Sequence, residues 1–136
     1  MRYMLDTNIL IYVLNAREHH QAVLARFDAE DPSDLVVSAF TFAELRFGVE
    51  KSRRRQASRR ALQGALDAIN VLPFDANAAE AYGKVRAELE AAGQPIGPLD
   101  TLIAAHALSL GLTLVTANLR EFSRVRRLRV ENWASA

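Results

Sequence analysis

Four oxygen-bearing side chains, far apart in the sequence, could do chemistry if the fold gathered them: Asp6, Glu44, Asp100 and Asn118. Asp6 ends the apolar run of residues 3–5, where a carboxylate has to be solvated, paired or bound to a cation because burying it alone is very costly. Clustered carboxylates repel one another, and a divalent cation turns that repulsion into binding energy. Oxygen ligands suit Mg²⁺ or Mn²⁺. Such an ion can lower the pKa of a water and stabilise the charge on a phosphodiester. The residue types therefore suggest a hydrolytic metal site.

Alternating short strands and helices have to position these residues. Strands are expected over residues 1–6, 35–39, 71–74, 112–116 and 129–132, and helices over residues 7–15, 18–30, 41–51, 53–69, 75–92 and 98–110. The 136 residues are enough for one core, so residues 1–136 are expected to form a single domain. Helices between successive strands predict an α/β fold of three layers, with a central, mainly parallel sheet flanked by helices.

The carboxyl edge of that sheet is where ligands bind in α/β folds. Asp6 closes the first strand, Glu44 lies one helical turn past the second, and Asn118 directly follows the strand over 112–116. Asp100 reaches this edge only if its own helix starts there. Thr116 adds a hydroxyl oxygen at the same edge.

Glu44 and Asp100 each have a structural alternative to a role in chemistry. The neighbours of Glu44 are apolar, and a carboxylate in such surroundings needs a cation or a strong partner: Phe40, Phe42, Ala43, Leu45 and Phe47. Asp100 lies in the first turn of a predicted helix, where it could simply complement the helix dipole, an effect of at most about 1 kcal/mol at the surface.

Charge is distributed unevenly along the chain. The formal net charge is only +1, from 17 basic and 16 acidic residues, yet residues 51–60 hold six basic side chains and residues 120–129 hold five. All but two of the basic residues are Arg, whose forked guanidinium suits phosphate contacts. A solvated helix face would explain either run equally simply.

Composition argues against disordered and membrane chains. Half of the residues are hydrophobic and a quarter are charged, as in globular proteins. The apolar run over residues 9–14 is too short to cross a bilayer. The absence of Cys excludes disulfides and thiolate metal sites and fits a reducing compartment, so a cytoplasmic location is expected.

Four segments, which span nearly the whole chain in order, resemble the PIN-domain family and specifically the VapC-type toxins of bacterial toxin–antitoxin pairs. They are MLDTNILIYVL, SAFTFAELRFGVEK, PIGPLDTLIAAHA and LVTANLREFSRVRRLRVENW. The resemblance implies a PIN fold and a Mg²⁺- or Mn²⁺-dependent endoribonuclease. Asp6, Glu44 and Asp100 match the acidic triad of the family, which would hold the metal. Asn118 stands at a fourth position that is often Asp, and Glu121 one turn later could substitute for it.

The same resemblance implies further roles and partners. Thr7 and Thr116 match positions that hydrogen-bond the acids or water, although a helix cap or a strand end would explain them as well. Candidate RNA contacts are the arginines of the first basic run: Arg53, Arg54, Arg55, Arg59 and Arg60. The favoured substrate is tRNA, with the anticodon stem-loop of initiator tRNA as one possibility, cut to leave 5′-phosphate and 3′-hydroxyl ends. A VapB-like antitoxin, a homodimer and a larger toxin–antitoxin assembly are the expected partners.

Two other functions were weighed for this chain, and three of its features are expected to be structural. A receiver-like phospho-acceptor domain also gathers acids at strand ends, but it needs a late lysine, and no lysine follows Lys84. A catalytically weak PIN domain that only binds RNA or protein is the alternative, supported by Asn118. Three further features are expected to be structural: His106 within a helix, Trp133 at the core edge, and the phenylalanines near Glu44. An apolar groove near residues 53–60 could nevertheless accept an antitoxin helix.

Overall fold

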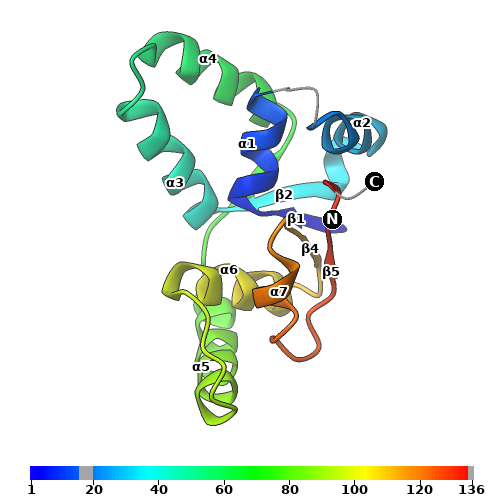
Figure 1. Ribbon diagram of the computed structural model, residues 1–136, viewed down its shortest axis with the longest axis vertical. Coiled ribbons are helices and arrows are strands. Elements are labelled where there is room, and N and C mark those ends of the chain that lie inside the picture. Colours follow the sequence, from blue (N-terminus) through cyan, green and yellow to red (C-terminus); the bar gives the residue numbers. More distant parts are fainter. Residues whose placement is uncertain (16–19, 135–136) are drawn as a thin grey trace.

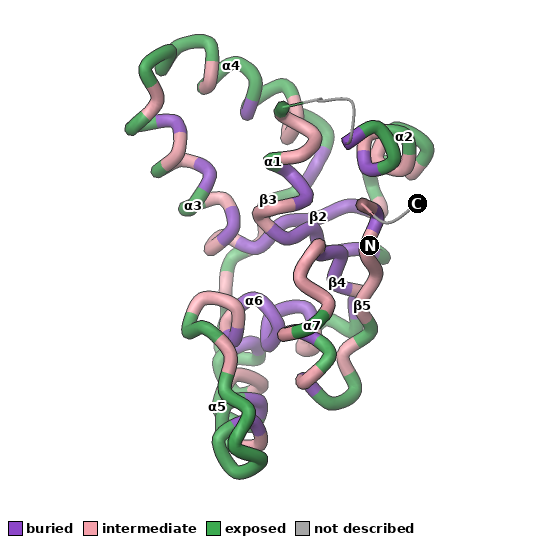
Figure 2. The backbone as a smooth tube through the Cα atoms, viewed as in Figure 1, coloured by how far each residue is buried: buried purple, intermediate pink, exposed green. Residues whose placement is uncertain are grey.

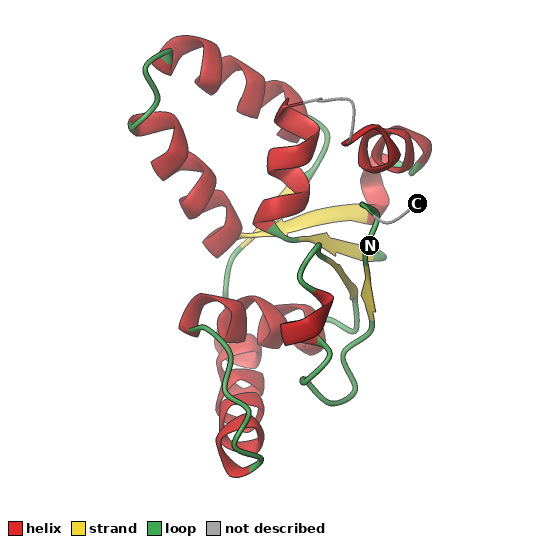
Figure 3. Cartoon of the chain, viewed as in Figure 1, coloured by secondary structure: helices red, strands yellow, loops and turns green. Residues whose placement is uncertain are grey.

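The computed structural model describes residues 1–15 and 20–134. Five strands form one parallel sheet in the order β3-β2-β1-β4-β5. The strands are β1 (Tyr3–Leu5), β2 (Leu35–Ser38), β3 (Asn70–Leu72), β4 (Thr113–Val115) and β5 (Val130–Glu131). The helices are α1 (Thr7–Asn15), α2 (Gln21–Ala29), α3 (Ala39–Glu50), α4 (Arg55–Leu66), α5 (Ala76–Ala91), α6 (Pro98–Ser109) and α7 (Leu119–Phe122), with a short 3₁₀ turn at Pro32–Asp34 (Figures 1 and 3).

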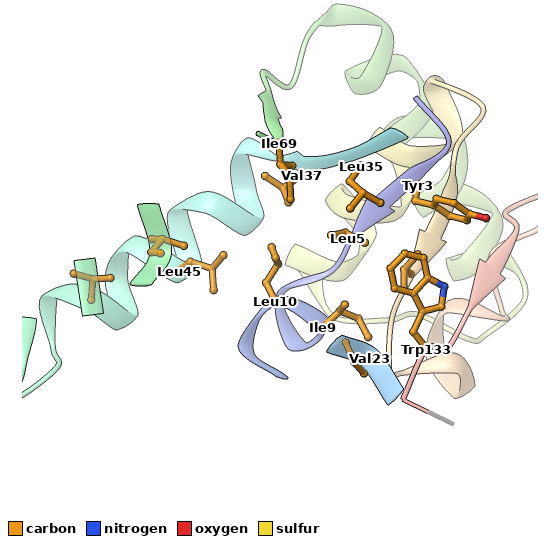
Figure 4. Close-up of a cluster of buried hydrophobic side chains, with 13 residues drawn as sticks. Tyr3, Leu5, Ile9, Leu10, Val23, Leu35, Val37, Leu45, Ile69 and Trp133 are labelled. Carbon is orange, nitrogen blue, oxygen red and sulfur yellow. The ribbon is translucent and has the colours of Figure 1, made fainter. Parts of the chain in front are cut away.

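Side chains alternate between the two faces of the sheet, and each face has its own core. Tyr3 and Leu5 of β1 point into a cluster formed with residues of α1, α2, α3 and α4 (Figure 4). Met4 points the other way, into a cluster formed with α5, α6 and α7. The central strands are buried on both faces (Figure 2), as expected of a parallel sheet covered by helices. The predicted three-layer α/β fold is therefore confirmed.

Several predicted boundaries were wrong, each for a local reason. The second strand ends at Ser38 and α3 begins at Ala39, earlier than expected, because the Ser38 hydroxyl accepts a hydrogen bond from the Phe40 amide at 3.2 Å and caps the helix. β3 covers Asn70–Leu72 and stops before Pro73, which has no N–H to donate. The four-residue α7 was missed because it is too short to show a helical period. The helix expected from residue 18 begins at Gln21 within the described residues, and residues 16–19 lie outside them.

The corner between α2 and the C-terminal segment is held by one arginine. The Arg26 guanidinium contacts two acids, Glu30 at 2.9 Å and Glu131 at 3.4 Å, and donates a hydrogen bond to the Tyr3 hydroxyl at 3.2 Å. It also lies 4.8 Å from the ring centroid of Trp133. Trp133 is 4% exposed and packs edge-on against Tyr3, which confirms its predicted place at the core edge.

No helix in the described part of the chain is both long enough and apolar enough to cross a membrane.

Candidate metal and active site at the carboxyl edge of the sheet

Asp6 lies at the centre of the carboxyl edge, directly after β1, and is 4% exposed. Its backbone amide still belongs to the sheet, donating to the Val115 carbonyl at 2.8 Å. One carboxylate oxygen accepts from the Thr7 amide at 2.9 Å. The other accepts from the Thr116 hydroxyl at 2.8 Å and from the Asn8 side chain at 3.3 Å. Three donors therefore fix this carboxylate, which supports the predicted contacts of Thr7 and Thr116 with the acids.

Glu44 is joined to Asp6 through Thr7. The Thr7 hydroxyl donates to Glu44 Oε1 at 2.5 Å, while the Thr7 amide donates to Asp6. Glu44 is exposed and is not enclosed by its apolar sequence neighbours as expected, because the buried side of α3 is formed by Thr41, Leu45 and Val49. Phe47, expected in the core, is 65% exposed for the same reason.

Asp100 reaches the same edge because α6 begins there. Pro98 occupies the first turn of α6, and the Thr101 amide and hydroxyl both donate to the Gly97 carbonyl at 2.9 Å. The Asp100 carboxyl lies within hydrogen-bonding reach of the Glu121 carboxyl of α7, and a bond between them requires a proton on one of the two. Glu121 in turn accepts from the Asn118 side-chain amide at 3.2 Å. The two residues considered for the fourth position are thus neighbours, and Glu121 is the one that contacts Asp100.

Burial and mutual repulsion raise the pKa values of two of these acids. Burial is the main cause for Asp6, opposed by hydrogen bonds from Thr116 and Thr7, with the charge of Glu44 raising its pKa further. The pKa of Asp100 rises to about 6, first because of burial and then because of the charge of Asp6, the hydrogen bond to Glu121, and the charges of Glu121 and Glu44. The four acids therefore form one electrostatically coupled group.

None of the four acids has a basic partner in the described part of the chain. Within residues 1–15 and 20–134, no ion pair up to 4 Å joins Asp6, Glu44, Asp100 or Glu121 to Lys, Arg or His. The same residues contain no group of three His, Asp or Glu already arranged around one point as metal ligands. The donor set nevertheless fits Mg²⁺ or Mn²⁺ by its chemistry, since it consists of carboxylate, amide and hydroxyl oxygens.

The two basic runs lie in different places. Arg120 and Arg124 belong to α7 and the residues just after it, beside Glu121. The first run, with Arg53, Arg54, Arg55, Arg59 and Arg60, lies at the turn between α3 and α4 and along α4, at the end of α3 that points away from the sheet (Figure 1). Arg55 there pairs with Glu50 at 3.6 Å. The structure does not bring this run next to the acids.

A groove between α1, α3 and α4 opens beside the acids. Its volume is about 380 Å³, and Thr7 and Glu44 line it together with apolar side chains that include Ile11, Leu14 and Val49. Ile11 is 41% exposed. The groove extends to Ser58 and Ala61 of α4, so it lies near residues 53–60 as expected.

Sequence reasoning missed one residue of the site, Asn8, and one buried polar residue of the helix that carries Glu44, Thr41. Asn8 bridges β1 and β4, because its side chain donates to Asp6 and accepts from the Ala117 amide at 3.0 Å. Its position two residues after Asp6 was the available signal. Thr41 is buried three residues before Glu44, and its hydroxyl has no partner among the described residues. Nothing in the sequence marked Thr41.

Comparison with known proteins gives a consistent result. The PIN domain family matches residues 3–128. A protein of Shigella flexneri named tRNA(fMet)-specific endonuclease VapC is 41% identical over 134 residues, which cover 98% of this chain and 99% of that protein. A ribonuclease VapC of Haemophilus influenzae is 43% identical over 133 residues and covers 98% of each chain.

Solved structures agree with these sequence matches. The VapC chain of a DNA-bound VapBC complex from Salmonella typhimurium superposes with a TM-score of 0.89 at 40% identity, covering 98% of each chain. A FitAcB structure from Neisseria gonorrhoeae gives a TM-score of 0.86 at 29% identity, covering 98% of this chain and 99% of that one.

Proposed function

Because this chain belongs to the PIN-domain family, we propose that it is a divalent-metal-dependent endoribonuclease of the VapC type, and that residues 1–136 act as one domain. The observation that carries the proposal is the set of four acids at the carboxyl edge, where burial and then mutual repulsion raise the pKa of Asp100 to about 6 and no basic partner is found among the described residues. PIN-domain nucleases generally depend on a divalent metal.

The acids have distinct roles in this proposal. Asp6, Glu44 and Asp100 would hold Mg²⁺ or Mn²⁺, which when bound lowers the pKa of water and stabilises negative charge on the phosphate. Asp6 is held by three hydrogen bonds and so needs little reorganisation. Glu121, kept beside Asp100 by the Asn118 amide, supplies the fourth acid that Asn118 itself lacks. We expect cleavage to leave 5′-phosphate and 3′-hydroxyl ends.

RNA contacts are divided between the two basic runs. Arg120, exposed in α7 beside Glu121, is placed to contact phosphates close to the cleaved bond. The first run would contact the RNA backbone further away: Arg53, Arg54, Arg55, Arg59 and Arg60. The substrate we propose is tRNA, and initiator tRNA in particular, since the Shigella relative carries that specificity in its name. A tRNA substrate implies a cytoplasmic location.

The proposed partner is a VapB-like antitoxin. The groove beside Thr7 and Glu44 combines an exposed apolar lining with direct access to the acids, so a partner segment lying in it would also cover the site. Several of the similar solved structures are toxin–antitoxin complexes. We propose that the chain forms a homodimer within such an assembly.

The proposal is tested by incubating purified chain, freed of any antitoxin, with total tRNA in Mg²⁺, in Mn²⁺ and in EDTA. Discrete fragments should form with either ion and not with EDTA, and Asp6→Asn should abolish them. Asp28→Asn is the matched control, because Asp28 is an exposed aspartate of α2 and its substitution makes the same change in charge. A folded wild-type protein that cuts no RNA with either ion would favour a binding-only PIN domain.

A further inference from the structure

Two of the acids are carried by helices that one buried hydrogen bond connects. His106 of α6 lies with Nδ1 2.9 Å from the hydroxyl oxygen of Ser38, the residue that caps α3. Both side chains are buried, at 2% and 0% exposure. Among the described residues, this is the one side-chain hydrogen bond between α6 and the segment Ser38–Glu50. It thus joins the helix that carries Asp100 to the helix that carries Glu44.

The direction of this hydrogen bond follows from the other contact of the ring. The Pro73 carbonyl can only accept, so the hydrogen of the neutral ring lies on Nε2, which faces it. His106 Nδ1 is then the acceptor, and the Ser38 hydroxyl donates to it while its oxygen accepts from the Phe40 amide. Burial lowers the pKa of His106, opposed by the charge of Asp75 and the Pro73 bond, and this favours the neutral ring that the arrangement requires.

Aromatic rings surround the hydrogen bond. Phe74 meets the His106 ring edge-on at 5.3 Å between ring centroids, and it meets Phe40 in the same way at 5.1 Å. Phe40 is the second residue of α3, so both the polar and the aromatic contacts act on the start of that helix. Buried and enclosed, the bond exchanges little with water, and leaving either partner unpaired would be costly.

The positions of the acids along their helices give this bond a mechanical role. Glu44 follows Ser38 by six residues and His106 follows Asp100 by six residues. At a rise of 1.5 Å per residue, each acid is about 9 Å along its helix from the bond. A shift of either helix at the bond is therefore passed to a carboxylate at that distance.

We propose that His106 is a positioning residue that, through Ser38, sets the spacing of Glu44 and Asp100. This role rests on the proposed nuclease function and is independent of any contact between His106 and RNA. Displacement of catalytic groups by about 1 Å can reduce turnover by about 100-fold. Loss of the Ser38 bond should therefore lower kcat and leave KM for RNA nearly unchanged, since the arginines that would hold RNA lie elsewhere.

Two amide variants separate the two bonds of the ring. In His106→Asn, the side-chain oxygen can occupy the place of Nδ1 and keep accepting from Ser38. In His106→Gln, the amide nitrogen can occupy the place of Nε2 and keep donating to Pro73, while the Ser38 hydroxyl loses its acceptor. We expect the Gln variant to lose about tenfold or more in kcat, and the Asn variant to stay within about threefold of wild type. Both remove the ring from Phe74, which matches their packing losses.

Ser38→Ala and the double variant Ser38→Ala/His106→Gln complete a cycle, in which the double variant should lose no more kcat than Ser38→Ala alone. Unfolding midpoints are measured for every variant, and kcat and KM are measured at a temperature where all are folded. Equal kcat values for the Asn and Gln variants, or additive losses in the double variant, would overturn the role of His106 while leaving the nuclease function intact. A folded wild-type chain that cleaves no RNA would instead overturn the proposed function, and with it this role.

Discussion

The acids at the carboxyl edge and the acids at the α2 corner are treated in opposite ways by the same fold. At the corner, Glu30 and Glu131 share the guanidinium of Arg26, which also bonds Tyr3 and lies over Trp133. At the edge, Asp6 is buried and Asp100 is half-buried, and the partners described for them are neutral groups and other acids. One region is electrostatically balanced and the other is not.

The difference shows which region lowers the stability of the folded state. Buried carboxylates without cationic partners raise the free energy of the folded state, and such sites persist where charge is needed for function. Other exposed acids of the chain pair with arginines, as Glu90 does with Arg86 and Glu88 with Arg127. What sets the edge apart is that its unpaired acids lie close enough to raise one another's pKa, where the topology and the groove coincide.

Asp100→Asn should show the largest difference between the carboxyl edge and the α2 corner. We expect at least about 100-fold less tRNA cleavage, because an acid proposed to hold the metal is lost. We also expect higher stability, because the cost of burying this charge and its repulsion with Asp6 and Glu121 are both removed. Cleavage and denaturant unfolding measured on the same preparation test both parts. A variant that is inactive and also less stable would contradict the claim that these acids are strained by one another.

A substitution at the α2 corner should have the opposite result, with stability lowered and activity kept. Arg26→Ala removes the cation shared by two acids and two rings and should cost about 2 kcal/mol of stability with kcat unchanged. Arg86→Ala is the matched control: its ion pair with Glu90 is exposed, and its loss should change stability far less than Arg26→Ala does. If urea unfolding shows equal losses of stability in the two variants, the contacts of Arg26 contribute no more than an exposed ion pair does.

The pH dependence of stability should separate the regions further. The folded pKa of Asp100 lies near 6, above its ordinary value of 3.8, so the folded state binds this proton more tightly than the unfolded state. Its contribution to stability is therefore fully present below about pH 4 and is lost as the pH rises through 6. Because Asp100 is partly exposed, we expect Asp100→Asn to be more stable than wild type by about 1–2 kcal/mol at pH 8, with no advantage at pH 4. A constant difference across this range would assign the effect to another cause.

The smallest expected effect concerns Thr41, beneath the edge. Its buried hydroxyl has no described partner, so the nearly isosteric Thr41→Val should leave stability unchanged or raise it by up to about 1 kcal/mol. Thermal unfolding measures this. A loss above about 1 kcal/mol would reveal a hydrogen bond at Thr41 that matters for the fold.

Local rules predicted much of this molecule from its sequence. A carboxylate at a strand end and helices between strands were enough to place Asp6 and Asn118 at one edge. The orientation of Glu44 was not predictable in the same way, since apolar residues surround it in sequence and only packing on α1 and α4 decides which side of α3 is buried. The bond between Ser38 and His106 spans 68 residues, and no local pattern indicates it.

The most direct test of the central claim is the effect of Mn²⁺ on thermal unfolding of wild type and Asp100→Asn, without RNA. If the four acids form one cation site, Mn²⁺ should raise the unfolding midpoint of wild type as its concentration increases and should have little effect on the variant. An equal rise in both proteins, or none in either, would contradict the account.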